Sequence, residues 1–332
     1  MFGLHQVVRG KCAAAALAIT AATIAVPGTM HAQFPPDSLV NLQVLPQDIT
    51  FRELIGVMRG FTSALGVRCQ YCHMGEGGQP LSTFDFPSDA RETKRKARVM
   101  IRMVRSINQE HLAGLESRGE PEVIVECATC HRGQSRPRMI DDVLREAYTD
   151  GGIHAMIARY RELHGQYYGS HTFDFRWFIL RNLANELAGT GAVSDGAALH
   201  SLNLEFFPDN PMVRIAHAVA SIESALIGSG PEAGIARFRE LQEQFPAGPA
   251  TENQLNSMGY RLMGRELLPA AIEVFKLNVE VNPQSSNVYD SLGEAYMNNG
   301  ETDLAIRNYE RSLELNSDNA NATQTLERLR SN

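Results

Sequence analysis

The stretch from Ser286 to Ser317 reads SNVYDSLGEAYMNNGETDLAIRNYERSLELNS and decides the fold of the C-terminal half. Residues of the same kind recur 34 positions apart in and before it, as in the pairs Gly259 and Gly293, Ala271 and Ala305, and Phe275 and Tyr309. A period of this length predicts supersecondary units that each pair two helices and bury their apolar faces against neighbouring units.

Paired helices that repeat every 34 residues are the signature of the tetratricopeptide repeat. A further echo lies earlier in the chain, because IARYREL at 157–163 returns as IARFREL at 235–241. The earlier copies are stretched and less regular. We count about four helical pairs, which are enough to stack a continuous core. The sequence therefore predicts an α-solenoid of tetratricopeptide-like helix pairs over residues 146–332.

The N-terminal part is predicted to be helical as well. Apolar residues at helical spacing predict a helix over residues 50–65, which Gly66 ends. A second, longer helix is predicted from an N-cap at Ser88 to about Leu112, after a loop over residues 74–87. Since no strand pattern is visible, we expect an all-α chain with a small helical domain over residues 33–145.

The cysteines carry the chemistry of this small domain. Of the five, Cys12 lies near the N-terminus and the other four form two Cys-x-x-Cys-His motifs. Two thiols one helical turn apart can add to both vinyl groups of a haem, and the adjacent histidine then supplies the proximal nitrogen. Cys-x-x-Cys-His is accordingly the attachment signal of c-type haem. The sequence predicts two covalently bound haem c groups, with thioether bonds from Cys69, Cys72, Cys127 and Cys130 and iron ligation by His73 and His131.

Three other readings of the cysteine pairs are weaker. A zinc site built from two such pairs has them roughly 15–20 residues apart, whereas Cys72 and Cys127 are 55 positions apart. A thioredoxin-type dithiol needs a βαβ context. A disulfide staple would not need a histidine after each pair. Haem attachment is the favoured interpretation.

Methionines are candidates for the sixth ligand, opposite each histidine. A thioether there raises the reduction potential, whereas an open position permits the binding of small molecules. Met58 lies on the apolar face of the helix before the first motif. Met100 lies on the apolar face of the helix before the second motif, and Met103 follows one turn later. Periodicity alone leaves each as either a ligand or core filler.

Basic residues crowd the second predicted helix: Arg91, Lys94, Arg95, Lys96, Arg98, Arg102 and Arg105. A solvated helix face is the favoured interpretation, because runs of charge usually are solvated. The alternative is that they pair with haem propionates, as Arg132 also could, or that they dock an acidic redox partner.

The N-terminus predicts export. Arg9 and Lys11 precede an apolar run from Cys12 to Val26, which is the order of a secretory signal peptide over residues 1–32 and predicts a periplasmic protein. The run is shorter than the roughly 20 residues of a spanning helix, and an uncleaved membrane anchor is the alternative. The net charge of −7 gives no signal for nucleic-acid binding.

Two segments resemble the photosynthetic reaction-centre cytochrome c subunit family. Residues 58–73, MRGFTSALGVRCQYCH, resemble one haem segment, and residues 97–108 with 125–133 resemble the next. The resemblance implies that the methionine on each preceding helix is the sixth ligand, here Met58 and Met100, and that Met103 is not one. The family's subunit carries four haems, whereas this chain has two motifs and a helical-repeat tail.

We therefore expect an electron carrier and not an enzyme. Its partners would be redox proteins docked through the helical-repeat tail, with peripheral association to a membrane complex. The process that it serves, whether photosynthesis, respiration or extracellular transfer, stays open. The competing interpretations are a two-haem peroxidase, which needs one exchangeable iron position, and a haem-sensing scaffold.

Overall fold

The computed structural model describes residues 36, 38–245 and 248–331. Within these ranges every regular element is helical, and the only strand-like feature is an isolated bridge between Met74 and Asp85. The predicted all-α class is confirmed. None of the described helices is both long and apolar enough to cross a membrane. The predicted signal peptide over residues 1–32, with Cys12, lies outside the described residues.

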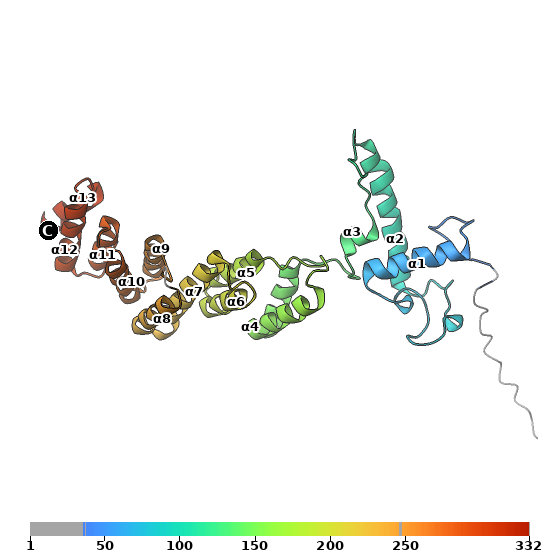
Figure 1. The fold of residues 1–332 in the computed structure, drawn as a ribbon, viewed down its shortest axis with the longest axis horizontal. Coiled ribbons are helices and arrows are strands. Elements are labelled where there is room, and N and C mark those ends of the chain that lie inside the picture. Colours follow the sequence, from blue (N-terminus) through green and yellow to red (C-terminus); the bar gives the residue numbers. More distant parts are fainter. Residues whose placement is uncertain (1–35, 37, 246–247, 332) are drawn as a thin grey trace, which may run out of the picture. The chain divides into compact units, whose positions relative to one another are not determined.

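The chain divides into two compact units (Figure 1). One consists of the described residues up to Ser63 together with Val67–Cys127, and the other of Ala64–Gly66 together with the described residues from Ala128 onward. The predicted domains, 33–145 and 146–332, place the boundary later in the chain. Whether those two ranges fold independently stays a prediction.

The first unit holds α1 (Phe51–Leu65) as far as Ser63 and all of α2 (Glu92–Ser106), and α3 (Cys127–His131) begins at its last residue. The start of α1 is set by a reciprocal cap. The Thr50 N–H donates to the Glu53 carboxylate (2.9 Å), and the Glu53 N–H donates to the Thr50 hydroxyl (3.3 Å). Such a capping box satisfies N–H groups that have no partner inside the helix. The predicted helix over 50–65 is therefore confirmed.

The second predicted helix differs at both ends. It begins at Glu92 and not after Ser88, whose hydroxyl instead accepts the Ala90 N–H in a turn (3.2 Å). Beyond Ser106 the chain passes through a π-helical turn at Ile107–His111 and a 3₁₀ turn at Leu112–Gly114. The start was wrong because side chains of α2 hold the preceding segment in a non-helical conformation, as described below.

The second unit is a succession of helices. They are α4 (Ile140–Tyr167), α5 (Trp177–Gly189), α6 (Val193–Phe206), α7 (Pro211–Ser229), α8 (Pro231–Gln244), α9 (Glu252–Gly264), α10 (Leu268–Val281), α11 (Ser286–Asn298), α12 (Thr302–Leu315) and α13 (Ala320–Ser331). Consecutive helices pack together as the pairs α5–α6, α7–α8, α9–α10 and α11–α12 (Figure 1). The predicted α-solenoid is confirmed, with about four pairs as counted from the repeat.

One hydrogen bond recurs in three of these pairs. A fully buried side chain on the second helix donates to the carbonyl of the first residue of its partner helix, 26 positions earlier. The bonds are Asn203 to Trp177 (2.9 Å), Asn278 to Glu252 (3.1 Å) and Ser312 to Ser286 (2.9 Å). The donors of the last two bonds, Asn278 and Ser312, are 34 positions apart, so the hydrogen bond recurs with the same period as the sequence.

Glycine lets the two helices of a pair approach closely. A Cβ atom added to Gly259 on α9 would lie 2.4 Å from the ring of Phe275 on α10, far inside van der Waals contact. Gly293 and Tyr309 form the equivalent pair in the next repeat, with 3.2 Å. The recurrence of glycine and an aromatic residue at this spacing thus has a packing cause.

His200 occupies the equivalent of that aromatic position, three residues before Asn203. Its side chain is 5% exposed, and its Nδ1 has no hydrogen-bond partner in the described structure. Burial lowers the pKa of His200 to about 4. Since an unfolded histidine has a pKa of about 6.5, the unfolded state binds more protons between these values, and stability falls as the pH drops through that window. We expect acidification from pH 7.5 to 4.5 to cost about 3 kcal/mol at most through this group.

Replacement of His200 by phenylalanine tests this expectation. Denaturant unfolding of the second unit at both pH values should show that His200→Phe removes most of this acid-induced loss. The exposed His154→Phe is the matched control and should retain the loss. Equal pH dependence in the native chain and His200→Phe would refute the assignment.

Candidate functional site

The first Cys-x-x-Cys-His motif forms one tight turn after α1. A 3₁₀ turn at Cys69–Tyr71 is extended by two bonds, from the N–H groups of Cys72 and His73 to the Cys69 carbonyl (3.2 and 3.0 Å). Both cysteines and the histidine are half-buried, and neither cysteine is in a disulfide. Burial raises the pKa of the Cys72 thiol. One turn of backbone therefore carries all three groups that the predicted attachment needs.

The loop after this motif fixes the orientation of His73. The His73 Nδ1 donates to the Phe86 carbonyl (3.2 Å), and the two rings meet edge to face at 5.0 Å. Phe86 in turn stacks on the buried ring of Phe84. Burial, and next the positive charge of Lys94, lower the pKa of His73. A neutral imidazole that donates from Nδ1 presents its Nε2 lone pair, which is the form that ligates a metal.

The second motif forms a helical turn of its own, α3. His131 donates from Nδ1 to the Gln134 carbonyl at 2.8 Å. Its Nε2 is thus the nitrogen presented for ligation, as in His73. Cys127 is half-buried, Cys130 is exposed, and neither is in a disulfide. Both motifs therefore share a histidine whose tautomer is set by a backbone carbonyl.

The turn after His131 is fastened to the end of α1. The Gly133 N–H donates to the Ala64 carbonyl (2.9 Å). Gly66 has a φ of +64°, and a Cβ atom there would lie 2.0 Å from the Gly133 carbonyl oxygen. Only glycine meets both conditions. The backbone that follows His131 is held in place by this contact.

The two methionines lie on the helices that the sequence assigned them to. Met58 is half-buried on α1. Met100 and Met103 on α2 are 39% and 42% exposed, so neither is core filler. The assignment of Met58 and Met100 as iron ligands stays a prediction.

The first unit has little apolar core of its own. Among its described residues, only Val44 and Phe84 are buried hydrophobic side chains. Large hydrophobic side chains are instead exposed: Val40, Tyr71, Met74, Leu81, Val99, Met100, Met103, Leu115, Val123 and Ile124. Exposed apolar side chains are available to pack against a further apolar body bound to this unit. The thiols, the oriented histidines and these apolar side chains fit haem c.

Asn108 ties α2 to the segment that leads into the second motif. Its side-chain amide donates to the carbonyls of Val104 (2.9 Å) and Val125 (2.7 Å), and its oxygen accepts the Val125 N–H (2.9 Å). Arg118 closes the same network, because its guanidinium binds the carbonyls of Asn108 and Leu112. The side chain of Asn108 thus sets the backbone two residues before Cys127. Sequence reasoning missed Asn108, because a bond across 17 positions leaves no periodic signal.

Asn108→Ala is expected to destabilise the first unit by about 1–3 kcal/mol, since it removes the side-chain partner of both the N–H and the carbonyl of Val125. Denaturant unfolding of the mature protein measures this loss. Asn108→Asp keeps the acceptor for the Val125 N–H and should cost less. An alanine variant as stable as the native protein would contradict this role.

The basic residues of α2 are not simply a solvated face. Lys94 and Arg98 have side chains 12% and 9% exposed, and both pair with Asp89 (3.2 and 2.8 Å). Arg95 donates to the carbonyls of Asp89 and Ala90, and Arg105 to that of Val44. The interpretation as a solvated face is therefore wrong for Lys94 and Arg98. These cations anchor the neighbouring loops, and this explains why α2 does not start at Ser88.

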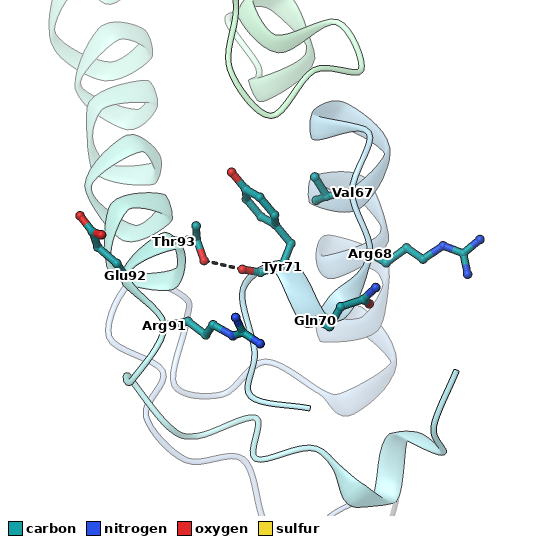
Figure 2. Close-up of a pocket in the computed structure, with 7 residues that line it drawn as sticks. All are labelled: Val67, Arg68, Gln70, Tyr71, Arg91, Glu92 and Thr93. Atoms are coloured by element: carbon teal, nitrogen blue, oxygen red, sulfur yellow. Dashed lines mark hydrogen bonds between the residues drawn. The ribbon is translucent and has the colours of Figure 1, made fainter. Parts of the chain in front are cut away.

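A cavity of about 640 Å³ lies beside the first motif. Figure 2 shows its lining residues, which are Val67, Arg68, Gln70, Tyr71, Arg91, Glu92 and Thr93. The Thr93 hydroxyl donates to the Tyr71 carbonyl and joins α2 to the motif. Arg68 and Arg91 are the cations here that could bind the carboxylates of a porphyrin.

The motifs and supporting contacts of the N-terminal part resemble those of a c-type cytochrome. The sequence model of the family described as "Photosynthetic reaction centre cytochrome C subunit" matches residues 6–159. Cytochrome c-554 of Chloroflexus aurantiacus is 38% identical over 101 residues, which are 30% of this chain and 21% of that protein. The chain thus spans about a fifth of the length of this relative. The resemblance to the family is confirmed for the N-terminal part.

Solved structures similar to the chain include repeat proteins. MamA (residues 41 to the end) from Desulfovibrio magneticus RS-1 is 15% identical, covers 48% of this chain and 85% of its own, and gives a TM-score of 0.29. YrrB, described as a tetratricopeptide protein with an unusual peptide-binding site, is 10% identical. The match covers 57% of this chain and 90% of YrrB, with a TM-score of 0.29. The assignment of the helix pairs here rests on the recurring bonds and glycine contacts described above.

Proposed function

We propose that this protein is a periplasmic electron carrier that holds two covalently attached haem c groups. The observation that carries the proposal is shared by the two motifs. In each, two cysteines three positions apart precede a histidine whose Nδ1 donates to a backbone carbonyl, at Phe86 for His73 and at Gln134 for His131. Haem iron, when bound, supplies a one-electron couple between the ferric and ferrous states.

The residues of the chain would hold and tune this couple. The cysteines would hold each porphyrin covalently, and His73 and His131 would bind the irons through Nε2. Met58 and Met100 would bind the opposite faces and raise the potentials. The exposed apolar side chains of the first unit would cover the porphyrins and exclude water.

The helical-repeat tail is proposed to dock redox partner proteins, with peripheral association to a membrane complex. Stacked helix pairs present an extended surface that suits such docking. Export by residues 1–32 to the periplasm is part of the same proposal. Deletion of residues 146–332 would abolish reduction by the native partner while exchange with a small mediator persists, if the tail serves docking.

Reversible redox titration of the mature protein tests the function. An electron carrier of this design takes up two electrons per chain and reacts with neither carbon monoxide nor peroxide. A high-spin haem that reacts with peroxide would support the alternative of a two-haem peroxidase.

A further inference from the structure

Lys94 binds the loop that orients His73. Its ammonium group, on a side chain 12% exposed, donates to the carbonyls of Phe86 (2.8 Å), Pro87 (3.0 Å) and Ser88 (2.8 Å). An ammonium has three donors, so the loop fixes this cation in place.

The Phe86 carbonyl is shared. It accepts from Lys94 at 2.8 Å and from the His73 Nδ1 at 3.2 Å. A cation on the same oxygen draws electron density away from it, and the carbonyl then accepts more weakly from the imidazole. A weaker acceptor makes the imidazole a poorer electron donor, because the partner of a ligating histidine sets its basicity. A less basic ligand favours ferrous over ferric iron.

Direct electrostatics act in the same direction. Lys94 and Arg98 place two cations near His73; Asp89 pairs with both, and the Asp85 carboxylate also acts on Lys94. The two cations have side chains only 12% and 9% exposed, whereas the Asp89 side chain is 34% exposed. A partly buried charge is screened less than an exposed one, and a positive charge disfavours the more positive ferric state.

The second motif lacks this arrangement. His131 donates to the Gln134 carbonyl at 2.8 Å, and in the part of the chain that the structure describes no lysine or arginine hydrogen bonds to that oxygen. The two motifs thus differ in whether a cation shares the carbonyl that the histidine donates to, and the histidine's bond is longer where it does (3.2 Å against 2.8 Å).

We propose that Lys94, with Arg98, raises the reduction potential of the first haem. This inference rests on the proposed function. Lys94 acts through the Phe86 carbonyl and is a positioning residue.

A spectroelectrochemical titration of the full mature protein tests the proposal. The reductive step missing from a Cys69→Ser, Cys72→Ser variant identifies the first haem. Lys94→Met should lower the equilibrium constant for reduction at that step by about tenfold, the size expected for the loss of one partly buried charge near the site. Tenfold corresponds to about 59 mV for a one-electron couple. The other step should stay in place.

Lys96→Met is the matched control. Lys96 lies on the same helix, but its side chain is 70% exposed and pairs only with Glu92 among the described residues. It should move neither step. Lys94→Arg keeps the charge and should restore most of the native potential.

Asp89→Asn gives an independent test with the opposite sign, should Lys94→Met fail to fold. Removal of the carboxylate leaves the cations of Lys94 and Arg98 uncompensated, so the first step should move to higher potential. The inference is overturned if Lys94→Met and Lys96→Met titrate alike, or if Asp89→Asn lowers the first step. A chain that carries no haem would instead overturn the proposed function, because no step would be seen at all.

Discussion

Replacement of Cys127 and Cys130 by serine is expected to halve the covalent haem content, from two groups per chain to one. Serine keeps the shape of the turn but cannot form a thioether bond. The helices of the second unit have their own buried cores, including Leu180, Leu255 and Phe275, so this unit should keep its unfolding transition. Haem stain after denaturing electrophoresis, with intact mass, measures the loss.

The reciprocal variant, with Cys69 and Cys72 replaced, should also retain one haem, and replacement of all four cysteines should give a colourless chain. Cys12→Ser is the matched control. Because Cys12 lies in the predicted signal peptide, its replacement should leave two haems on the mature protein. Unchanged haem content in either double variant would show that the motif is not an attachment site.

The second large effect is expected at the methionines. Met58→Ala should lower the potential of the first haem, and Met100→Ala that of the second, each by on the order of 0.1 V, because axial ligands set haem potentials over about 0.8 V. Loss of the thioether should also remove the corresponding charge-transfer absorbance and open a position for carbon monoxide. Redox titration and carbon monoxide difference spectra measure both effects.

Met103→Ala is the control for Met100→Ala. Both side chains lie on α2 and are similarly exposed, at 42% and 39%. A general effect of methionine loss on that helix would appear in both variants, whereas ligation would appear only at Met100. A drop in potential with Met103→Ala and none with Met100→Ala would move the ligand assignment to Met103.

Periodic features of the fold were predictable from the sequence. The apolar spacing of residues 51–65 gave a helix that the structure contains, and the 34-residue repeat gave helix pairs. The repeat is visible because its causes are local: Gly259 must be small beneath Phe275, and Asn278 must reach the start of the preceding helix. Because such requirements recur in successive repeats, residues of the same kind recur at a fixed spacing in the sequence.

Contacts between distant, non-periodic residues were not predictable. Lys94 and Arg98 looked like part of a charged surface, because the sequence does not show the carbonyls and Asp89 that they bind. For the same reason the start of α2 was misplaced. Asn108 gave no signal, since an asparagine at a helix end has many ordinary roles. The residues of Cys-x-x-Cys-His were recognisable from the sequence because haem attachment needs two cysteines and a histidine at this spacing.

The most direct measurement is a pyridine haemochrome assay combined with the intact mass of the mature protein, made in a host that matures c-type cytochromes. Two covalent haems per chain, with no free thiol at positions 69, 72, 127 and 130, is the predicted result. A colourless chain with four reactive thiols would contradict the assignment of both motifs.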